Sequence, residues 1–122
     1  MKTASQMTIE DLKNHKPEKA DFQTIREMAN KIARAFQPEK IILFGSYANG
    51  TATESSDVDF LVVMESDLPP PRRSVPMYRL MEDYMVPMDI LVRTRAEMEK
   101  YAGLPFSLAG TVKREGVILY ER

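Results

Sequence analysis

The chain has 122 residues, a length that suits one small domain. Its 17 basic and 18 acidic residues give a formal net charge of −1, which argues against a protein whose main ligand is long nucleic acid. It contains no cysteine, so a disulfide framework and a thiolate zinc site are excluded. Its one histidine, His15, stands in a lysine-rich polar stretch, where we expect a solvated side chain.

No apolar run approaches the roughly 20 residues of a membrane-spanning helix. The residues after Lys2 also lack the apolar core of a signal peptide. We therefore expect a cytoplasmic protein with no membrane partner. We also expect residues 1–20 to form a polar arm or short helix, and residues 21–122 to form the folded domain.

The first strong pattern is a run of apolar residues at helical spacing between Asp21 and Phe36. Asp21 is a suitable N-cap, and Pro38 stands beyond the other end. This pattern predicts an amphipathic helix over residues 21–36.

Two short apolar runs follow, separated by a stretch rich in Gly, Ser, Thr and Asn. They predict a buried strand over residues 41–44, a turn region over 45–56 and a second strand over 57–63. The connection is too short for the crossover that parallel neighbours need, so we expect these two strands to be antiparallel.

In the second half of the chain, the prolines of residues 65–76 predict a loop. Thr94 and Glu97 have the spacing of a capping box, and Gly116 is a helix breaker. The other expected elements are a helix over 77–84, a strand over 86–92, helices over 94–103 and 106–115, and an edge strand over 117–120. This order predicts an α/β fold, with a small mixed β-sheet packed with helices rather than a doubly wound parallel sheet.

Two carboxylates, Asp57 and Asp59, open the second predicted strand. Because side chains alternate along a strand, both point to the same face, with α-carbons roughly 6.6 Å apart at about 3.3 Å per residue. Such a pair can chelate one divalent cation and bridge a second, as phosphoryl transfer with two metal ions requires. The pair alone is weak evidence, because most such pairs face solvent or cap a turn.

A third carboxylate, Asp89, stands in the apolar run of residues 86–92. We expect it to be buried, and an unpaired buried charge costs several kcal/mol in rough terms. If this strand lies beside residues 57–63, Asp89 completes a cluster of three carboxylates that metal ions can neutralise. Carboxylate and water oxygens suit Mg²⁺.

A glycine and a serine, Gly45 and Ser46, follow the first predicted strand and open a short helix that runs towards Gly50. Glycine permits close approach of the backbone, and the Ser46 hydroxyl can donate to a phosphate oxygen. The sequence has neither the P-loop motif nor the Rossmann glycine motif. A plain helix cap is the alternative role for Ser46.

Taken together, Gly45-Ser46, ten further residues and then Asp57-Val58-Asp59 resemble the signature of the polymerase-beta-like nucleotidyltransferase superfamily. The residues around this signature look like its minimal nucleotidyltransferase (MNT) branch, the antitoxins of HEPN–MNT toxin–antitoxin pairs. The resemblance covers most of residues 21–122 and includes Asp89.

The resemblance implies a polymerase-beta-like fold in which Asp57, Asp59 and Asp89 bind Mg²⁺. Asp89 would also help to deprotonate the acceptor hydroxyl, and Gly45 and Ser46 would hold the triphosphate of ATP. Asn49 departs from the pattern, since many relatives carry a basic residue there. Arg72 and Arg73 could replace that charge, but we expect them to be a solvated pair.

The function that follows is a Mg²⁺-dependent adenylyltransferase that uses ATP to modify, and so silence, a HEPN toxin. The resemblance thus implies a nucleoside triphosphate and a HEPN-domain protein as partners, and a homo-oligomer remains open. Two alternatives also remain open. One is an antitoxin that acts only by binding its toxin, and the other is a nucleotidyltransferase for small molecules.

Overall fold

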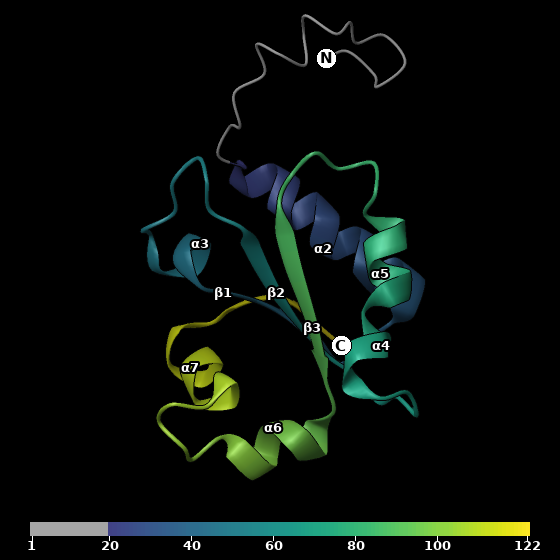
Figure 1. Ribbon diagram of the computed structural model, residues 1–122, viewed down its shortest axis with the longest axis vertical. Coiled ribbons are helices and arrows are strands. Elements are labelled where there is room, and N and C mark those ends of the chain that lie inside the picture. The colour runs from purple at the N-terminus through teal and green to yellow at the C-terminus, as the bar shows by residue number, and fades with distance from the viewer. Residues whose placement is uncertain (1–19) are drawn as a thin grey trace, which may run out of the picture.

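The computed structural model describes residues 20–122 as a four-stranded mixed sheet flanked by helices (Figure 1). The predictions for the N-terminal arm and for His15 lie outside the described residues. The strands are β1 (Lys40–Phe44), β2 (Val58–Val63), β3 (Met88–Arg93) and β4 (Val117–Glu121), in the spatial order β3-β2-β1-β4. β1 is antiparallel to both β2 and β4, whereas β2 and β3 are parallel. This confirms the predicted mixed sheet and the antiparallel first pair.

The first described helix, α2 (Phe22–Phe36), agrees with the prediction. The Asp21 side chain accepts a hydrogen bond of 2.7 Å from the Thr24 N–H, which stabilises the first turn. At the other end, Gln37 has a left-handed conformation with φ 48°, and its N–H donates to the Ala33 carbonyl.

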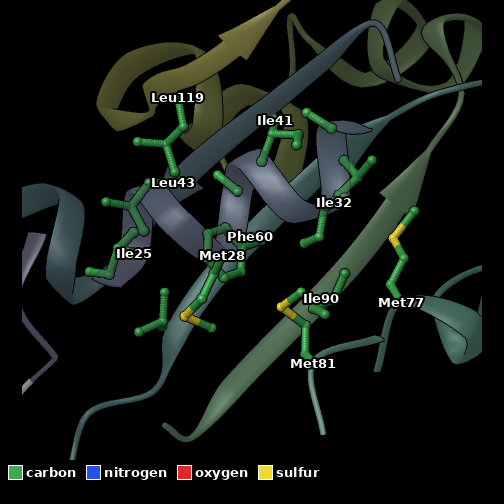
Figure 2. Close-up of a cluster of buried hydrophobic side chains, with 14 of the residues drawn as sticks. Ile25, Met28, Ile32, Ile41, Leu43, Phe60, Met77, Met81, Ile90 and Leu119 are labelled. Carbon is green, nitrogen blue, oxygen red and sulfur yellow. The ribbon is translucent and has the colours of Figure 1, made fainter. Parts of the chain in front are cut away.

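The main core lies between α2 and the face of the sheet that Val58, Phe60 and Val62 share (Figure 2). These three side chains of β2 are fully buried, as the alternation of the strand predicts. The cluster also includes residues from α2, β1, β3, β4 and α5 (Val75–Leu80). Besides Phe60, Figure 2 labels Ile25, Met28, Ile32, Ile41, Leu43, Met77, Met81, Ile90 and Leu119.

A second, smaller core covers part of the other face of the sheet. It contains Ile42, Leu61, Val63 and Val112, with side chains of α6 (Arg95–Tyr101) and α7 (Leu108–Glu115) packed against it. Asp59 lies on the same face of β2 as Leu61 and Val63, but nearer the start of the strand. On this face, α6 and α7 pack against the later residues of β2, and the polar side chain of Asp59 lies near its beginning.

The predicted loop over residues 65–76 is wrong in part. It contains α4 (Pro70–Arg73), and α5 begins at Val75 rather than at residue 77. Both helices have proline in their first two positions, where the missing N–H costs nothing because no carbonyl in the helix would accept it. Clustered prolines here begin two short helices instead of forming an extended loop.

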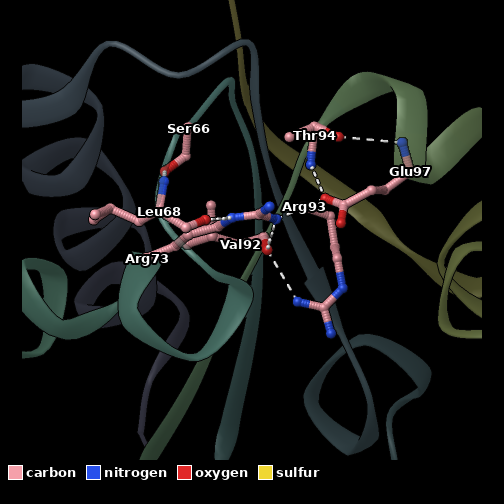
Figure 3. A network of polar contacts seen from close by, with 7 residues as sticks. All are labelled: Ser66, Leu68, Arg73, Val92, Arg93, Thr94 and Glu97. Atoms are coloured by element: carbon pink, nitrogen blue, oxygen red, sulfur yellow. Dashed lines mark hydrogen bonds and ion pairs between the residues drawn. The ribbon is translucent and has the colours of Figure 1, made fainter.

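A polar network joins α4 to α6 at the end of β3 (Figure 3). Arg73 donates a 2.6 Å hydrogen bond to Glu97 and another, of 2.9 Å, to the Leu68 carbonyl. Glu97 also accepts from the Thr94 N–H, while its own N–H donates to the Thr94 hydroxyl, which confirms the predicted capping box. Arg73 is therefore paired with Glu97 and largely buried, so the expectation of a solvated side chain is wrong for this residue.

The last strand begins at Val117 as predicted, whereas two other elements begin two residues later than expected. The strand predicted over 86–92 starts at Met88, and the helix predicted over 106–115 starts at Leu108, after its N-cap Ser107. Within residues 20–122, no helix has both the length and the apolar character that crossing a membrane requires.

Candidate active site

Two of the three predicted carboxylates are direct neighbours across the parallel pair of strands. Asp59 of β2 is in register with Asp89 of β3. Asp57 lies just before β2, two residues from Asp59. The parallel pairing therefore brings all three to the end of the sheet where β2 and β3 begin.

The glycine of the predicted signature lies against one of these carboxylates. Phe44, the last residue of β1, is in register with Asp59, so the chain leaves β1 beside that side chain. Gly45 has φ 74° and ψ −154°, a conformation almost confined to glycine. A β-carbon on Gly45 would overlap Oδ2 of Asp59 and lie 3.1 Å from its Cγ. The structure thus places Gly45 next to the carboxylates, as the signature predicts.

The turn after Gly45 contains the short helix α3 (Ser46–Asn49), which ends at Gly50 with φ 83°. Asn49, the departure from the family pattern, accepts a 3.1 Å hydrogen bond from the Thr51 N–H and one of 2.5 Å from the Thr51 hydroxyl. Asn49 therefore stabilises the turn beyond α3.

Three negatively charged side chains, Asp57, Asp59 and Asp89, lie close enough to affect the pKa of Asp59. Burial raises the pKa of Asp59, and the charges of Asp89 and then Asp57 raise it further. Asp57 and Asp89 are exposed. The predicted burial of Asp89 is wrong because β3 starts at Met88, which makes Asp89 only the second residue of the strand. A bound cation would therefore reduce the repulsion of Asp59 by Asp89 and Asp57, rather than offset a burial of Asp89.

The carboxylates do not form a ready-made chelate. Within residues 20–122, no three His, Asp or Glu side chains are arranged as a metal site. The donor chemistry nevertheless fits Mg²⁺, because three neighbouring carboxylates offer only oxygen ligands. Burial first, and then the charges of Asp89 and Asp57, raise the pKa of Asp59. Exposed Asp57 can change rotamer at little cost.

A tyrosine that the sequence analysis missed contacts the third carboxylate. The Tyr78 hydroxyl donates a 3.0 Å hydrogen bond to Oδ1 of Asp89 and accepts one of 2.7 Å from the Ile90 N–H. Burial raises the pKa of Tyr78, the Ile90 N–H lowers it, and the charge of Asp89 raises it again. No sequence pattern signals this contact, since it depends on how α5 packs beside β3 (Figure 1).

Asp57 and Asp89 lie on open surface, whereas Asp59 is half-buried. A hollow of about 190 Å³ between α6 and α7 is lined by Arg93 and Met98, among others, and includes none of the carboxylates. Arg93 ends β3, whereas Asp89 is near its start. Asp57 and Asp89 are therefore accessible from solvent rather than enclosed in this hollow.

The family comparison agrees with this arrangement. The family described as the nucleotidyltransferase domain matches residues 25–118, from α2 to the start of β4. The chain belongs to this family. The match confirms the resemblance expected from the signature.

The chain is similar in sequence to three proteins of Methanocaldococcus jannaschii. Each of them is named as a candidate protein adenylyltransferase. The identities are 45% over 47 residues, 46% over 46 residues and 35% over 73 residues. These segments cover 37%, 38% and 58% of this chain, and 47%, 29% and 73% of the respective relatives. The match thus spans about half the length of the first relative and less than a third of the second.

Two solved structures share the fold. A candidate nucleotidyltransferase from Sulfolobus solfataricus aligns with a TM-score of 0.58 and 20% identity, over 82% of this chain and 79% of the other. A toxin–antitoxin crystal structure with AMP-PNP aligns with a TM-score of 0.55 and 22% identity, over 80% and 73%. These alignments support the predicted polymerase-beta-like nucleotidyltransferase fold.

Proposed function

We propose that this chain is a Mg²⁺-dependent nucleotidyltransferase that moves AMP from ATP to a hydroxyl of a protein. The observation that carries the proposal is the position of Gly45 against Asp59, while Asp59 is in register with Asp89. Together these contacts bring the glycine-serine turn and the carboxylates to one end of the sheet. The family match and the names of the relatives favour the same chemistry.

In this proposal each residue has a distinct task. Asp57 and Asp59 hold Mg²⁺ with Asp89, and Gly45 and Ser46 hold the triphosphate. Mg²⁺, when bound, stabilises negative charge on the attacking and leaving oxygens. Asp89 accepts the proton of the acceptor hydroxyl as its oxygen attacks the α-phosphorus and pyrophosphate leaves.

The acceptor that we propose is a tyrosine of a HEPN-domain toxin, which the modification silences. The exposure of Asp57 and Asp89 favours an acceptor carried by a second protein. The relatives named as protein adenylyltransferases and the toxin–antitoxin neighbour with AMP-PNP point in the same direction.

The test combines the purified chain, Mg²⁺ and ATP with a HEPN-domain protein as the proposed partner. Intact-mass spectrometry should show one or more adenylyl groups on the partner, mapped by peptide analysis to tyrosine. Asp57→Asn should abolish the modification, whereas Asp67→Asn, which changes an exposed aspartate in the loop after β2, should leave it unchanged.

An unmodified partner that is nevertheless bound and inactive would support an antitoxin that acts by binding alone. Modification of a small molecule, with the partner unmodified, would support the small-molecule alternative. Either result would reject protein adenylylation.

A further inference from the structure

We propose that Tyr78 is an acceptor within the chain itself, so that the protein adenylylates its own phenol oxygen. The inference rests on the proposed function, since it uses the same carboxylates and the same nucleoside triphosphate. It adds a modification site and a way to regulate the active site.

The starting point is the position of the Tyr78 hydroxyl, which donates to Asp89 Oδ1 at 3.0 Å. Asp89 is the proposed proton acceptor, and a general base must lie within hydrogen-bond reach of the hydroxyl that it deprotonates. Tyr78 therefore already meets the requirement that a foreign acceptor would have to meet.

A second contact prepares the same oxygen for attack. The Ile90 N–H donates to the Tyr78 hydroxyl at 2.7 Å. The carbonyls of Pro87 and Arg93 accept hydrogen bonds from β2 and from the residue after it. Because the backbone groups of successive residues in a strand point to opposite edges, those of Ile90 point away from β2. The backbone donor stabilises the negative charge that develops on the phenol oxygen as it loses its proton, and the Asp89 carboxylate is placed to accept that proton.

The other described tyrosines provide a contrast. The Tyr47 hydroxyl accepts from the Ala20 N–H, and the Tyr84 ring lies under the Lys31 ammonium. In residues 20–122, Tyr78 is the one tyrosine whose hydroxyl is hydrogen-bonded to a carboxylate. Tyr78 is also 38% exposed, so the residue is accessible from solvent.

The step balances without any further reactant. The Tyr78 O–H bond breaks and Asp89 takes the proton. A bond forms between the phenol oxygen and the α-phosphorus of ATP, and the bond to the bridging oxygen breaks, so that pyrophosphate leaves with its electron pair. The product carries AMP beside Asp89, where it would block a foreign acceptor.

The experiment incubates the purified full chain with Mg²⁺ and ATP, without a partner protein. Intact-mass spectrometry should show a gain of one adenylyl group, and peptide mass spectrometry of the wild-type chain should place it on Tyr78. Tyr78→Phe should lose the label, and so should Asp57→Asn. Tyr101→Phe, which removes the hydroxyl of an exposed tyrosine on α6, should keep it.

Two results would overturn the inference while the proposed function stands. One is an unmodified chain that still binds ATP in a Mg²⁺-dependent manner and modifies its partner. The other is a label on a different residue that Tyr78→Phe retains. A wild-type chain that neither binds ATP with Mg²⁺ nor releases pyrophosphate would reject the proposed function as well. A label on Tyr78 that persists in Asp57→Asn would show chemistry outside this site, and would also overturn the inference.

Discussion

The α-carbon of Gly45 lies directly against the carboxylate of Asp59, with no room for a β-carbon between them. The contact joins the end of β1 to the start of β2, which are paired in register at this point. It makes the backbone turn and the carboxylate parts of one structural unit. A change at Gly45 should therefore affect the carboxylate site as well as the fold.

We predict that Gly45→Ala lowers the free energy of unfolding by about 1–3 kcal/mol, the cost of a residue forced into this backbone region. The new methyl group also displaces Asp59, so the rise in melting temperature on adding Mg²⁺ and ATP should be largely lost. Gly50→Ala is the matched control, because Gly50 also has a positive φ, 83°, but no atom within 4 Å of the added β-carbon. Gly50→Ala should cost about 1 kcal/mol and keep the rise. If the melting temperature of Gly45→Ala rose on adding Mg²⁺ and ATP as much as that of the wild type, Gly45 and Asp59 would not belong to one site.

The repulsion among the carboxylates gives a second prediction. Asp59→Asn removes the half-buried charge that the other two repel, so it should raise the metal-free melting temperature. The gain should be on the order of 1 kcal/mol, since exposed Asp57 and Asp89 are screened by solvent. The variant should also gain less from Mg²⁺ and ATP. Thermal unfolding with and without Mg²⁺-ATP measures both effects, and Asp67→Asn should change neither. A variant that melts lower without metal and gains as much from Mg²⁺-ATP as the wild type would reject the shared site.

Substitution of Asp89 should separate chemistry from binding. Asp89→Asn should lower turnover by about 10²-fold or more, the effect of losing a general base, and should retain most of the Mg²⁺-ATP affinity. The asparagine oxygen can still accept from the Tyr78 hydroxyl, so the packing of α5 should be preserved. A pyrophosphate-release assay beside calorimetry provides the measurement. An affinity as low as that of Asp57→Asn would make Asp89 mainly a metal ligand.

Local signals predicted most of the fold. Asp21 and the Thr94–Glu97 capping box fixed two helix starts, because caps depend on residues close in sequence. The apolar runs and the glycine-serine turn predicted the strands and the position of Gly45 beside the carboxylates. Prolines misled the analysis at α4, since they are unfavourable inside a helix but favourable in its first turn.

The contacts that the sequence did not predict join residues far apart along the chain. Tyr78 meets Asp89 eleven residues later, and Arg73 meets Glu97 twenty-four residues later. Both contacts depend on how helices pack against β3, which no local pattern encodes. The predicted burial of Asp89 was wrong because β3 starts at Met88, two residues later than predicted. Asp89 therefore lies near the end of the strand, where its side chain is exposed.

The Arg73–Glu97 pair predicts a pH-dependent contribution to stability. The N–H of Thr94 and then the Arg73 guanidinium lower the pKa of Glu97 from 4.5 to about 2. Because the folded-state pKa is lowered, the contribution is fully present above pH 4.5 and is lost as pH falls towards 2. Arg73 is 9% exposed and Glu97 33%, so solvent screens part of the pair and we expect about 1–2 kcal/mol at pH 7.

Urea unfolding of the wild type and of Glu97→Gln across this pH range measures that contribution. Glutamine can keep the capping box with Thr94, so the difference between the two proteins reports the charge of Glu97. The difference should be largest at pH 7 and should approach zero only as pH falls below 2, where the wild-type side chain becomes protonated in the folded state as well. Glu99→Gln, an exposed change on the same helix, should differ from the wild type by less than about 0.5 kcal/mol throughout. A Glu97→Gln difference that stays constant with pH would show that shape, rather than charge, makes the Glu97 contribution.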